Sequence, residues 1–525
     1  MTIVGIGGIL HDAACALLRD GVLVAAVEQR KIARRRRVGE LPEESIQACL
    51  RMAETSPEQV DCVAVVRPLA AGPEAALHLK LRERFPASQI VLVEHQAAHA
   101  ASAYYATDFS EATVLTLDRA GDFRCGARWR GSGNQLSLER ELYYPDSLGD
   151  LYSRVTELLG FEANADEHKV QWLSTTGDAR YRDVFLRMLP AGEGGWLRLD
   201  RSYLDGDRLS RGGFSAKFYE ALGLADGAEV PPELRASVAA GLQQAVEAVV
   251  VEMAGAGENL CLAGGLLYNA LLVEALERSG RWQNVFVQPA AGNAGTALGA
   301  VFWAWHVIYG KTERARLGDL CLGPSFSPDE IKRVLENCKL RFRYLLTTDE
   351  LIEKAVEQIT TDRIIAWMHG RMEFGPRALG NRSILASPLN PYSTENLNAF
   401  IKHREPFRKF AASVPEELAA EFFEVGPNAR YLATVGRVRP QYRDALRSAI
   451  LGENRVRVHT VRKEDNPLYW RLLCAFGEKT GLPILYNTSF NLFGDPLVCS
   501  PRDAVRSFYS SGIDAMFVGN FFLEK

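Results

Sequence analysis

The chain has 525 residues, of which 47% are apolar and 24% charged, and its formal net charge is −4. This length exceeds one ordinary domain, and the composition is that of a globular protein, which excludes a fibrous or largely disordered chain. The near-neutral charge argues against a surface built for nucleic acid, and no apolar run reaches the roughly 20 residues of a membrane span.

The first segment predicts a strand, a glycine loop and a hairpin. Residues 2–6 are apolar and β-branched and run into Gly7-Gly8. Residues 13–18 and 22–27 are further strand-like runs, and Asp20-Gly21 between them is a strong hairpin signal because such a turn needs positive φ. This arrangement at the start of a long α/β chain suits an actin- or Hsp70-like ATPase, where the hairpin brings backbone amides to phosphates.

Two polar features accompany this segment. His11 and Asp12 lie in the glycine-rich entry loop, where the imidazole is a candidate proton acceptor beside a phosphate site, with an ordinary loop histidine as the alternative. Arg34 to Arg37 form an unbroken arginine run. The run is either a solvated loop or an electropositive approach for anionic ligands.

A histidine pair, His95 and His99, is spaced i, i+4 in an alanine-rich stretch that favours a helix over 94–103. This spacing puts both imidazoles on one helix face, where they can share a metal ion, although such pairs also occur without one. Asp118 follows a predicted strand at 112–117 and is a candidate carboxylate to complete the set. Nitrogen and oxygen ligands without thiolate suit Fe(II), Mn(II) or Zn(II).

A second strand-and-glycine unit lies in the middle of the chain. Residues 259–262 form a predicted strand that leads into Gly264 and Gly265, followed by a helix through residue 276. Such alternation predicts a mostly parallel sheet with ligands at the carboxyl ends of its strands. We interpret the polar, glycine-punctuated stretch 135–235 as an insertion and lid.

The pattern breaks near residue 323, and a typical helix start follows at 327–330. We place a domain boundary near residue 340, with a second α/β unit after it. The predicted strand at 363–368 ends in a polar loop at 370–383 that holds three arginines and three glycines.

This loop and two later segments predict an anion site. Arginine forks match phosphate oxygens, and glycines let the backbone approach a ligand. The amide and hydroxyl groups at 486–491 suit a polyphosphate or ribose, and a surface ion-pair network is the alternative interpretation. The candidate residues are Arg371, Arg377, Arg382, Lys402, Arg404, Arg408, Asn487, Ser489 and Asn491.

Six stretches, all in the family's order, resemble the NodU/CmcH family of O-carbamoyltransferases nearly end to end. The two most specific are GRMEFGPRALGNRSILASP at 370–388 and YNTSFNLFGDPLVCSP at 486–501. The others are HDAACALL at 11–18, HAASAYY at 99–105, EHKV at 167–170 and AGGLLYNALL at 263–272.

The resemblance implies an α/β protein with two linked active sites. Residues 1–340 would form an actin/Hsp70-like ATPase domain of duplicated ribonuclease-H-like units, as in tRNA threonylcarbamoyladenosine-synthesis proteins. Residues 345–525 would form a YrdC-like α/β domain. The second domain would convert carbamoyl phosphate and ATP into carbamoyl adenylate, and the first would transfer the carbamoyl group to a hydroxyl, with water kept from the intermediate.

The resemblance also assigns roles to single residues. His11, with Asp12, would be the catalytic pair, and His11 the base on the acceptor hydroxyl. Fe(II) or another divalent metal would bind at the histidine pair, and Mg²⁺ is a further candidate cofactor beside ATP and carbamoyl phosphate. The metal set is His95, His99, Asp118 and Asn293, the first nucleotide loop is Gly264, Gly265, Asn269 and Gly292, and the candidate anion-site residues would bind ATP and carbamoyl phosphate.

Several positions depart from the family pattern. Asn293 stands where the family usually has a metal-ligating aspartate, and an amide is a neutral and poorer ligand. Gln29 replaces a glutamate, and Ser174-Thr175-Thr176 replaces an Ala-Pro-Tyr run, both on the acceptor side. In the second domain, Leu389 stands where arginine is common, and Lys409 and Ala412 replace prolines.

The nine cysteines are scattered without a CxxC pair, which is typical of a reducing compartment. We therefore predict a cytoplasmic enzyme that acts on a small-molecule hydroxyl acceptor, with no nucleic-acid or membrane partner. Aminoglycosides, macrocycles, cephalosporin precursors and lipo-oligosaccharides are all acceptor classes that the resemblance allows, and the oligomeric state stays open. The alternatives are a threonylcarbamoyl-type tRNA-modification enzyme and a non-catalytic nucleotide-binding relative.

Overall fold

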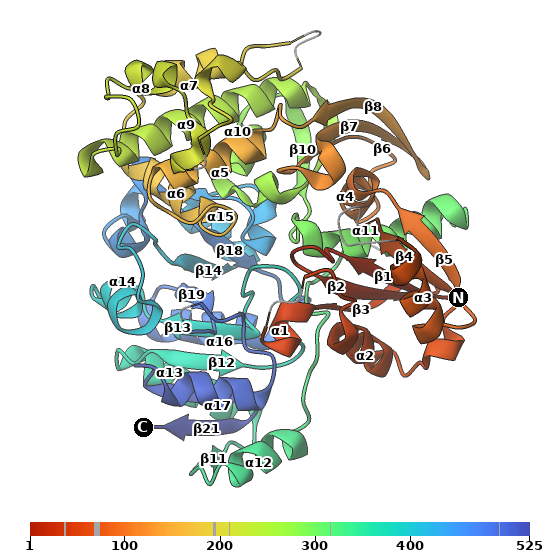
Figure 1. Ribbon diagram of the computed structural model, residues 1–525. Helices are drawn as coiled ribbons and strands as arrows, with labels where there is room; N and C mark the ends of the chain where they lie inside the picture. Colours follow the sequence, from red (N-terminus) through yellow and green to blue (C-terminus); the bar gives the residue numbers. More distant parts are fainter. Residues whose placement is uncertain (36–37, 68–73, 193–195, 209, 315–316, 493) are drawn as a thin grey trace.

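The computed structural model describes residues 1–35, 38–67, 74–192, 196–208, 210–314, 317–492 and 494–525. Two arginines of the run at 34–37, Arg36 and Arg37, lie outside these ranges. Figure 1 shows the C-terminal sheet and its helices at the lower left, the N-terminal sheet at the right, and a helical layer above them. No helix in the described ranges has both the length and the apolar character that a membrane span needs.

The first sheet has the strand order β3-β2-β1-β4-β5, and its β2–β3 hairpin confirms the predicted turn. Asp20 and Gly21 both adopt positive φ, 49° and 81°, as such a turn requires. The strands are β1 (Thr2–Gly7), β2 (Ala14–Arg19), β3 (Val22–Glu28), β4 (Cys62–Val66) and β5 (Gln89–Val93). The helices are α1 (Gln29–Ala33), α2 (Glu43–Met52), α3 (Glu74–Arg84) and α4 (His95–Tyr104).

The second sheet, with the order β10-β9-β6-β7-β8, repeats the topology of the first. In each sheet an antiparallel three-stranded meander continues into two parallel strands, so the duplication that we predicted is present. The prediction of a mostly parallel sheet was wrong, because both meanders pair antiparallel. The strands are β6 (Glu111–Leu117), β7 (Arg124–Ser132), β8 (Gln135–Tyr143), β9 (Gly257–Ala263) and β10 (Trp282–Val287).

Two helices, α4 and α11 (Thr296–Trp303), pack together between the two sheets. Helix α11 contacts β1, β2 and β4, whereas α4 contacts β6, β7 and β9. The alanine-rich α4 permits close packing, and a Cβ at Gly299 would lie 1.8 Å from the Ala98 carbonyl oxygen. This close approach fixes the position of His95 and His99 relative to the strand ends.

Most of the stretch 135–235, which we interpreted as an insertion and lid, is inserted between β8 and β9 of the second sheet, where the first sheet has a much shorter connection. Its described residues include β8 and helices α5 to α8, which form a packed layer with α9 and α10 over the second sheet, as Figure 1 shows. Leu151, Phe185 and Phe214 are buried in one hydrophobic core with Val246 of α9. The helices are α5 (Leu148–Leu158), α6 (Glu167–Leu173), α7 (Arg182–Met188), α8 (Ala216–Ala221), α9 (Pro232–Ala254) and α10 (Ala270–Arg278).

The C-terminal domain is built on an eight-stranded mixed sheet with the order β11-β21-β20-β12-β13-β19-β14-β18. The strands are β11 (Arg343–Tyr344), β12 (Ile365–Met368), β13 (Arg382–Ala386), β14 (Ala411–Pro415), β18 (Val458–Val461), β19 (Leu485–Ser489), β20 (Ala515–Val518) and β21 (Phe521–Glu524). A small sheet holds β15 (Phe423–Glu424), β16 (Gly436–Val438) and β17 (Arg455–Val456). The helices are α13 (Thr348–Thr360), α14 (Ser393–Asn396), α15 (Ala419–Phe422), α16 (Pro467–Thr480) and α17 (Pro501–Tyr509).

Helix α12 (Pro328–Asn337) begins with the predicted cap, in which Ser327 and Glu330 form a capping box. Its Ile331 and Leu335 are buried in the core of the C-terminal sheet, and the helix packs against α17. By its packing α12 therefore belongs with the second domain, which moves the change of domain from residue 340 to the segment before Pro328.

Candidate metal centre and anion-binding site

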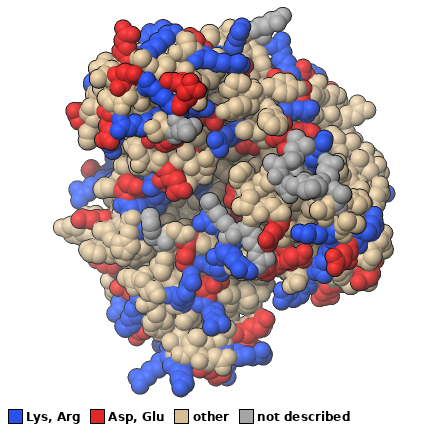
Figure 2. Space-filling model, in the orientation of Figure 1, with Lys and Arg blue, Asp and Glu red and all other residues tan. Residues whose placement is uncertain are grey.

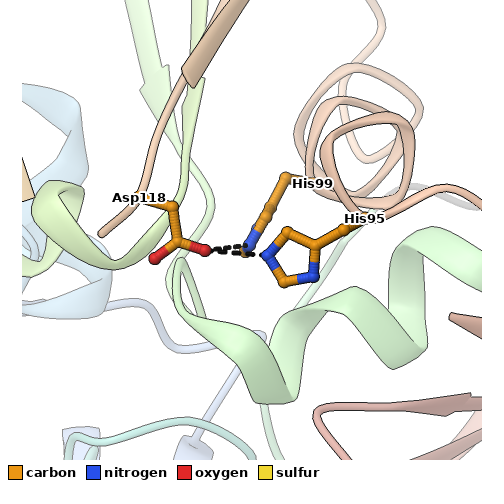
Figure 3. A group of neighbouring side chains, drawn as sticks. All are labelled: His95, His99 and Asp118. Atoms are coloured by element: carbon orange, nitrogen blue, oxygen red, sulfur yellow. Dashed lines mark hydrogen bonds and ion pairs between the residues drawn. The ribbon is translucent and has the colours of Figure 1, made fainter. Parts of the chain in front are cut away.

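A buried group of three side chains, His95, His99 and Asp118, forms where α4 meets the end of β6 (Figure 3). One possible ligand atom from each residue lies within 4.8 Å of the others. The Nε2 atoms of His95 and His99 are 2.8 and 3.3 Å from Asp118 Oδ2. The i, i+4 spacing and the strand-end carboxylate thus meet as the sequence predicted.

The electrostatics of this group favour an ionised carboxylate between two imidazoles. Burial acts to raise the pKa of Asp118, but its hydrogen bonds with His95 and His99 hold that pKa well below the usual value. Burial lowers the pKa of His99. Burial also acts to lower the pKa of His95, yet the hydrogen bond with Asp118 shifts it upward overall.

These residues fit a divalent metal ion. His99 Nδ1 and Asn293 Oδ1 are buried without a hydrogen-bond partner among the described residues, and such atoms are costly unless a ligand satisfies them. Space beside the group depends on glycine, since a Cβ at Gly121 would lie 2.4 Å from His95 Nε2. The two imidazoles and the carboxylate form a nitrogen and oxygen donor set without thiolate, and Asn293 would add an amide oxygen if its side chain reaches the ion.

The predicted nucleotide loop lies directly against His95, His99 and Asp118, which we call the metal group because they are the candidate metal ligands. Gly264 adopts a φ of 99°, and a Cβ there would lie 2.1 Å from the Leu117 carbonyl oxygen. A Cβ at Gly265 would lie 3.2 Å from Asp118 Oδ1, and one at Gly292 would lie 2.6 Å from the Tyr268 ring. Glycine at these positions therefore lets the end of β6 and the Tyr268 ring pack closely against the loop backbone.

The side chain of Asn269 stabilises this loop and is not available to a ligand. Its side-chain oxygen caps α10 by accepting from the Leu272 amide, and its amide nitrogen donates to Gln243 Oε1 at 2.8 Å. The side chain is buried, so its polar atoms already have protein partners. The sequence motif could not show that hydrogen bonds within the protein already occupy this amide.

The entry loop places His11 and Asp12 at the protein surface near the same region. A Cβ at Gly8 would lie 3.1 Å from the Asn293 carbonyl oxygen, and the short helix η8 (Asn293–Gly295) packs against both α4 and β1. The loop, Asn293 and the histidine helix are thus neighbours. His11 is not itself in contact with the metal group in any described interaction.

We expect Asn293→Asp to tighten divalent-metal binding by about tenfold or more, because it replaces a neutral oxygen by an anionic one beside the same ligands. Metal analysis and Mn(II) titration of protein purified without oxygen measure the change. Asn284→Asp, on the exposed surface of β10, is the matched control and should bind metal as the unmodified chain does. Unchanged affinity in Asn293→Asp would show that this side chain is not a ligand.

A second group lies in the C-terminal domain and consists of five cations that face one another. The charges of Arg404 and Arg408 lower the pKa of Lys402. Together with Arg377, they also lower the pKa of Arg457. Burial is the main cause that lowers the pKa of each, and the neighbouring cations add to it in all but Arg408. We call this group the cationic cluster: Arg377, Lys402, Arg404, Arg408 and Arg457.

The cationic cluster has too few carboxylates to balance it. Glu405 Oε2 lies 3.5 Å from Arg408 NH1, but Glu405 also pairs with Lys169 at 3.1 Å. Asp166, the other acid close by, pairs with the same lysine at 3.0 Å. Figure 2 shows positive and negative residues intermixed on the face drawn, so the cluster does not belong to a broad basic surface there. An anionic ligand would therefore stabilise this excess of positive charge.

The predicted amide and hydroxyl motif meets Lys402 directly. Lys402 Nζ donates to Asn491 Oδ1 at 2.6 Å and to the Ser489 carbonyl oxygen at 2.5 Å. Asn487 donates to the Ala378 carbonyl oxygen, while its own Oδ1 is buried without a partner among the described residues. The structure thus brings the segments at 402–408 and 486–491 together.

Arg371 and Arg382 are placed differently from the other predicted arginines. Arg371 donates to three backbone carbonyl oxygens, those of Gly323, Leu322 and Val24, and so joins the two domains. Arg382 is fully buried and donates to the carbonyl oxygens of His369, Gly370, Asn381 and Pro324. These two arginines therefore hold the loop in place, because their N–H groups already donate to backbone carbonyl oxygens.

Sequence reasoning missed several residues of this region. Arg457 precedes β18 and stacks on Trp172 with 5.1 Å between the guanidinium carbon and the ring centroid. His168 and Lys169 come from α6 of the first domain and reach the cationic cluster from the other side. The EHKV stretch at 167–170 was the available signal, but nothing in it indicates a contact with residues more than 200 positions away.

Arg34, the first arginine of the run, is held between the domains. Its guanidinium donates to the Leu497 carbonyl oxygen at 2.6 Å and lies 3.7 Å from carboxylate oxygens of Asp495 and Asp503. This arginine is therefore not in a solvated loop. Arg35 is exposed.

Arg377 connects the two sites. Its guanidinium donates to the Tyr268 carbonyl oxygen at 3.3 Å, and the Tyr268 ring packs on Gly292 beside the metal group. A small cavity at the domain junction is lined by Leu267, Tyr268, Gln288, Pro289, Arg377, Tyr431 and Ala433.

Comparison with known proteins gives one consistent result. The family described as carbamoyltransferase N-terminus matches residues 2–68 and 72–302, and that described as carbamoyltransferase C-terminus matches residues 356–525. The Synechocystis protein sll1178 is 33% identical over 100% of this chain and 96% of its own length. The nodulation protein NolNO of Sinorhizobium fredii is 34% identical over 98% and 79%, respectively. The 3'-hydroxymethylcephem-O-carbamoyltransferase of Amycolatopsis lactamdurans is 31% identical over 51% and 49%.

Proposed function

The chain belongs to the carbamoyltransferase family, and from this premise we propose that it is an ATP-dependent O-carbamoyltransferase. In this proposal it converts carbamoyl phosphate and ATP into carbamoyl adenylate and transfers the carbamoyl group to a hydroxyl of a small molecule, in natural-product biosynthesis. In this proposal the first domain, of the actin/Hsp70-like type, carries out the transfer, and the second, of the YrdC-like type, forms the adenylate.

The cationic cluster is the observation that carries the proposal. Carbamoyl phosphate and the ATP triphosphate are both multiply charged, and guanidinium groups bind phosphate oxygens in pairs. One buried and four half-buried cations, with two carboxylates near them among the described residues and both paired with Lys169, suit two such anions held against each other. The neighbouring Ser489 and Asn491 offer polar groups for the nucleotide.

Formation of the adenylate follows from holding the two anions together. Carbamoyl phosphate loses its phosphate with one water, and the resulting carbamate oxygen attacks the α-phosphorus of ATP as pyrophosphate leaves. The cluster offsets the negative charge that would otherwise keep the reactants apart. The adenylate then moves to the first domain past the domain junction, where Arg377 donates to the Tyr268 carbonyl oxygen.

Transfer takes place in the first domain. The acceptor oxygen attacks the carbamoyl carbon, AMP leaves, and His11 takes the hydroxyl proton. His95, His99 and Asp118, with Asn293, would hold a divalent metal ion such as Fe(II). The ion would supply Lewis-acid polarisation and bind phosphate oxygens. Gly264 and Gly265 let the nucleotide phosphate approach the backbone beside this group.

The test is pyrophosphate release from ATP by the full chain. We expect release that depends on carbamoyl phosphate and consumes both substrates in equal amounts. Release that is independent of carbamoyl phosphate, or none at all, would contradict the proposal and favour a non-catalytic nucleotide-binding relative. Turnover that requires tRNA would instead favour the tRNA-modification alternative.

A further inference from the structure

Helix α6 belongs to the first domain but forms one wall of the cationic cluster of the second. Lys169 pairs with Glu405 at 3.1 Å, and Glu405 pairs in turn with Arg408 at 3.5 Å. Trp172 lies three residues further along α6. The Arg457 guanidinium stacks on its ring, with 5.1 Å between the guanidinium carbon and the ring centroid. The helix is thus fixed to the cluster at two points, Lys169 and Trp172.

His168 lies directly before the first of these anchors. It is four residues before Trp172, and side chains at i and i+4 share one helix face. Its Nδ1 lies 3.1 Å from the Ala165 carbonyl oxygen, so Nδ1 carries the proton and Nε2 keeps its lone pair. No hydrogen bond from a described residue reaches Nε2.

The charges around His168 keep the ring neutral. Burial, Arg408 and Arg377, in this order, lower the pKa of His168 to about 3. Asp166 acts in the opposite direction but is paired with Lys169. At physiological pH the imidazole is therefore an uncharged hydrogen-bond acceptor close enough to Arg408 and Arg377 to be affected by their charges.

A carbamoyl donor needs such an acceptor. Arginine and lysine side chains offer only hydrogen-bond donors, which suit phosphate and carbonyl oxygens but not an amide N–H. The two acids nearest the cluster, Asp166 and Glu405, pair with Lys169, and their negative charge would repel the phosphate of the donor. Asn487 Oδ1 and His168 Nε2 are uncharged acceptors of this region without a hydrogen-bond partner among the described residues, and His168 Nε2 is the one that the first domain supplies.

We propose that His168 Nε2 accepts a hydrogen bond from the amide nitrogen of carbamoyl phosphate and thereby selects it over acetyl phosphate, which has a methyl group at that position. The inference rests on the proposed function, because it assigns a new residue to the same donor site. Sites that bind a substrate N–H reject the analogue without it far more strongly than apolar pockets reject a size difference.

Two stable phosphonates test the proposal by calorimetry on the full chain. Phosphonoacetamide carries the amide, acetonylphosphonate carries a methyl group in its place, and inorganic phosphate reports the cationic cluster alone. We expect the unmodified chain to bind phosphonoacetamide about 10- to 100-fold more tightly than acetonylphosphonate. His168→Leu should bind both equally, while its affinity for inorganic phosphate stays within about threefold.

Two further variants sharpen the result. His168→Asn keeps a side-chain acceptor and should restore part of the preference for the amide. His78→Leu, at an exposed position of α3, should behave as the unmodified chain. The proposal is overturned if His168→Leu keeps the preference, or if it loses phosphate binding, since the ring would then hold the cluster together. An unmodified chain that binds none of the three anions would instead refute the donor site and the proposed function with it.

Discussion

Arg457→Ala is expected to lower kcat/KM for carbamoyl-phosphate-dependent pyrophosphate release by about 100- to 1000-fold, which corresponds to roughly 3–4 kcal/mol. Arg457 stacks on Trp172 and makes no hydrogen bond to a described side chain, so its removal leaves no protein group without a partner. The loss therefore measures the interaction with substrate. Pyrophosphate release at varied carbamoyl phosphate and ATP concentrations shows which of the two substrates the guanidinium binds.

Arg404→Ala should lower kcat/KM for adenylate formation by a similar factor. Its interpretation is less direct, because Arg404 also donates to Asn398 Oδ1 at 2.7 Å and stacks on Phe410 at 4.1 Å. Arg404→Lys keeps the charge but loses the planar fork, and it should recover only part of the activity.

The matched control for both arginines is Arg443→Ala, on the exposed surface of the same domain. It should retain the activity of the unmodified chain. Full activity in a folded Arg457→Ala protein would contradict the placement of the donor site in the cationic cluster.

His11→Ala is expected to separate the two half-reactions. Carbamoyl-phosphate-dependent pyrophosphate release should stay within about threefold of the unmodified chain, whereas transfer to the acceptor should fall by about 100- to 10,000-fold. The physical reason is that His11 lies in the loop beside Asn293 in the first domain, apart from the cationic cluster. Mass spectrometry of hydroxylated acceptors detects transfer as the gain of one carbamoyl group.

His78→Ala is the control for the loss of an imidazole elsewhere in the first domain, and it should change neither half-reaction. If His11→Ala and Arg404→Ala lose adenylate formation equally, the division of labour between the two domains is wrong. If His11→Ala transfers normally, another group takes the hydroxyl proton.

Local sequence patterns were sufficient where the chemistry is close along the chain. The i, i+4 spacing of His95 and His99 placed both imidazoles on one face of α4, and Asp118 was predicted at the end of its strand because the apolar run before it stops there. The Asp20-Gly21 turn and the cap at Ser327 were predicted for the same reason, since backbone conformation at these points depends on a few adjacent residues.

The arginines show where local patterns stop being informative. Arg377 and Arg382 lie in one short loop with the same residue types around them, yet one joins the cationic cluster and the other donates to four carbonyl groups. Arg457 has an ordinary strand-like context and was not noticed. Which cation binds a ligand depends on which acceptors the fold brings near it.

The amino-acid order alone thus determined the α/β organisation in two parts, the meeting of His95, His99 and Asp118, and the segments from which an anion site would be built. Only the tertiary structure decided that 135–235 is a packed helical layer, that α12 packs with the second domain, and that α6 crosses to the cationic cluster. The reason is that turns, caps and helix faces follow from neighbouring residues. The partner of a buried charge is chosen by burial and by contacts between segments far apart in the chain.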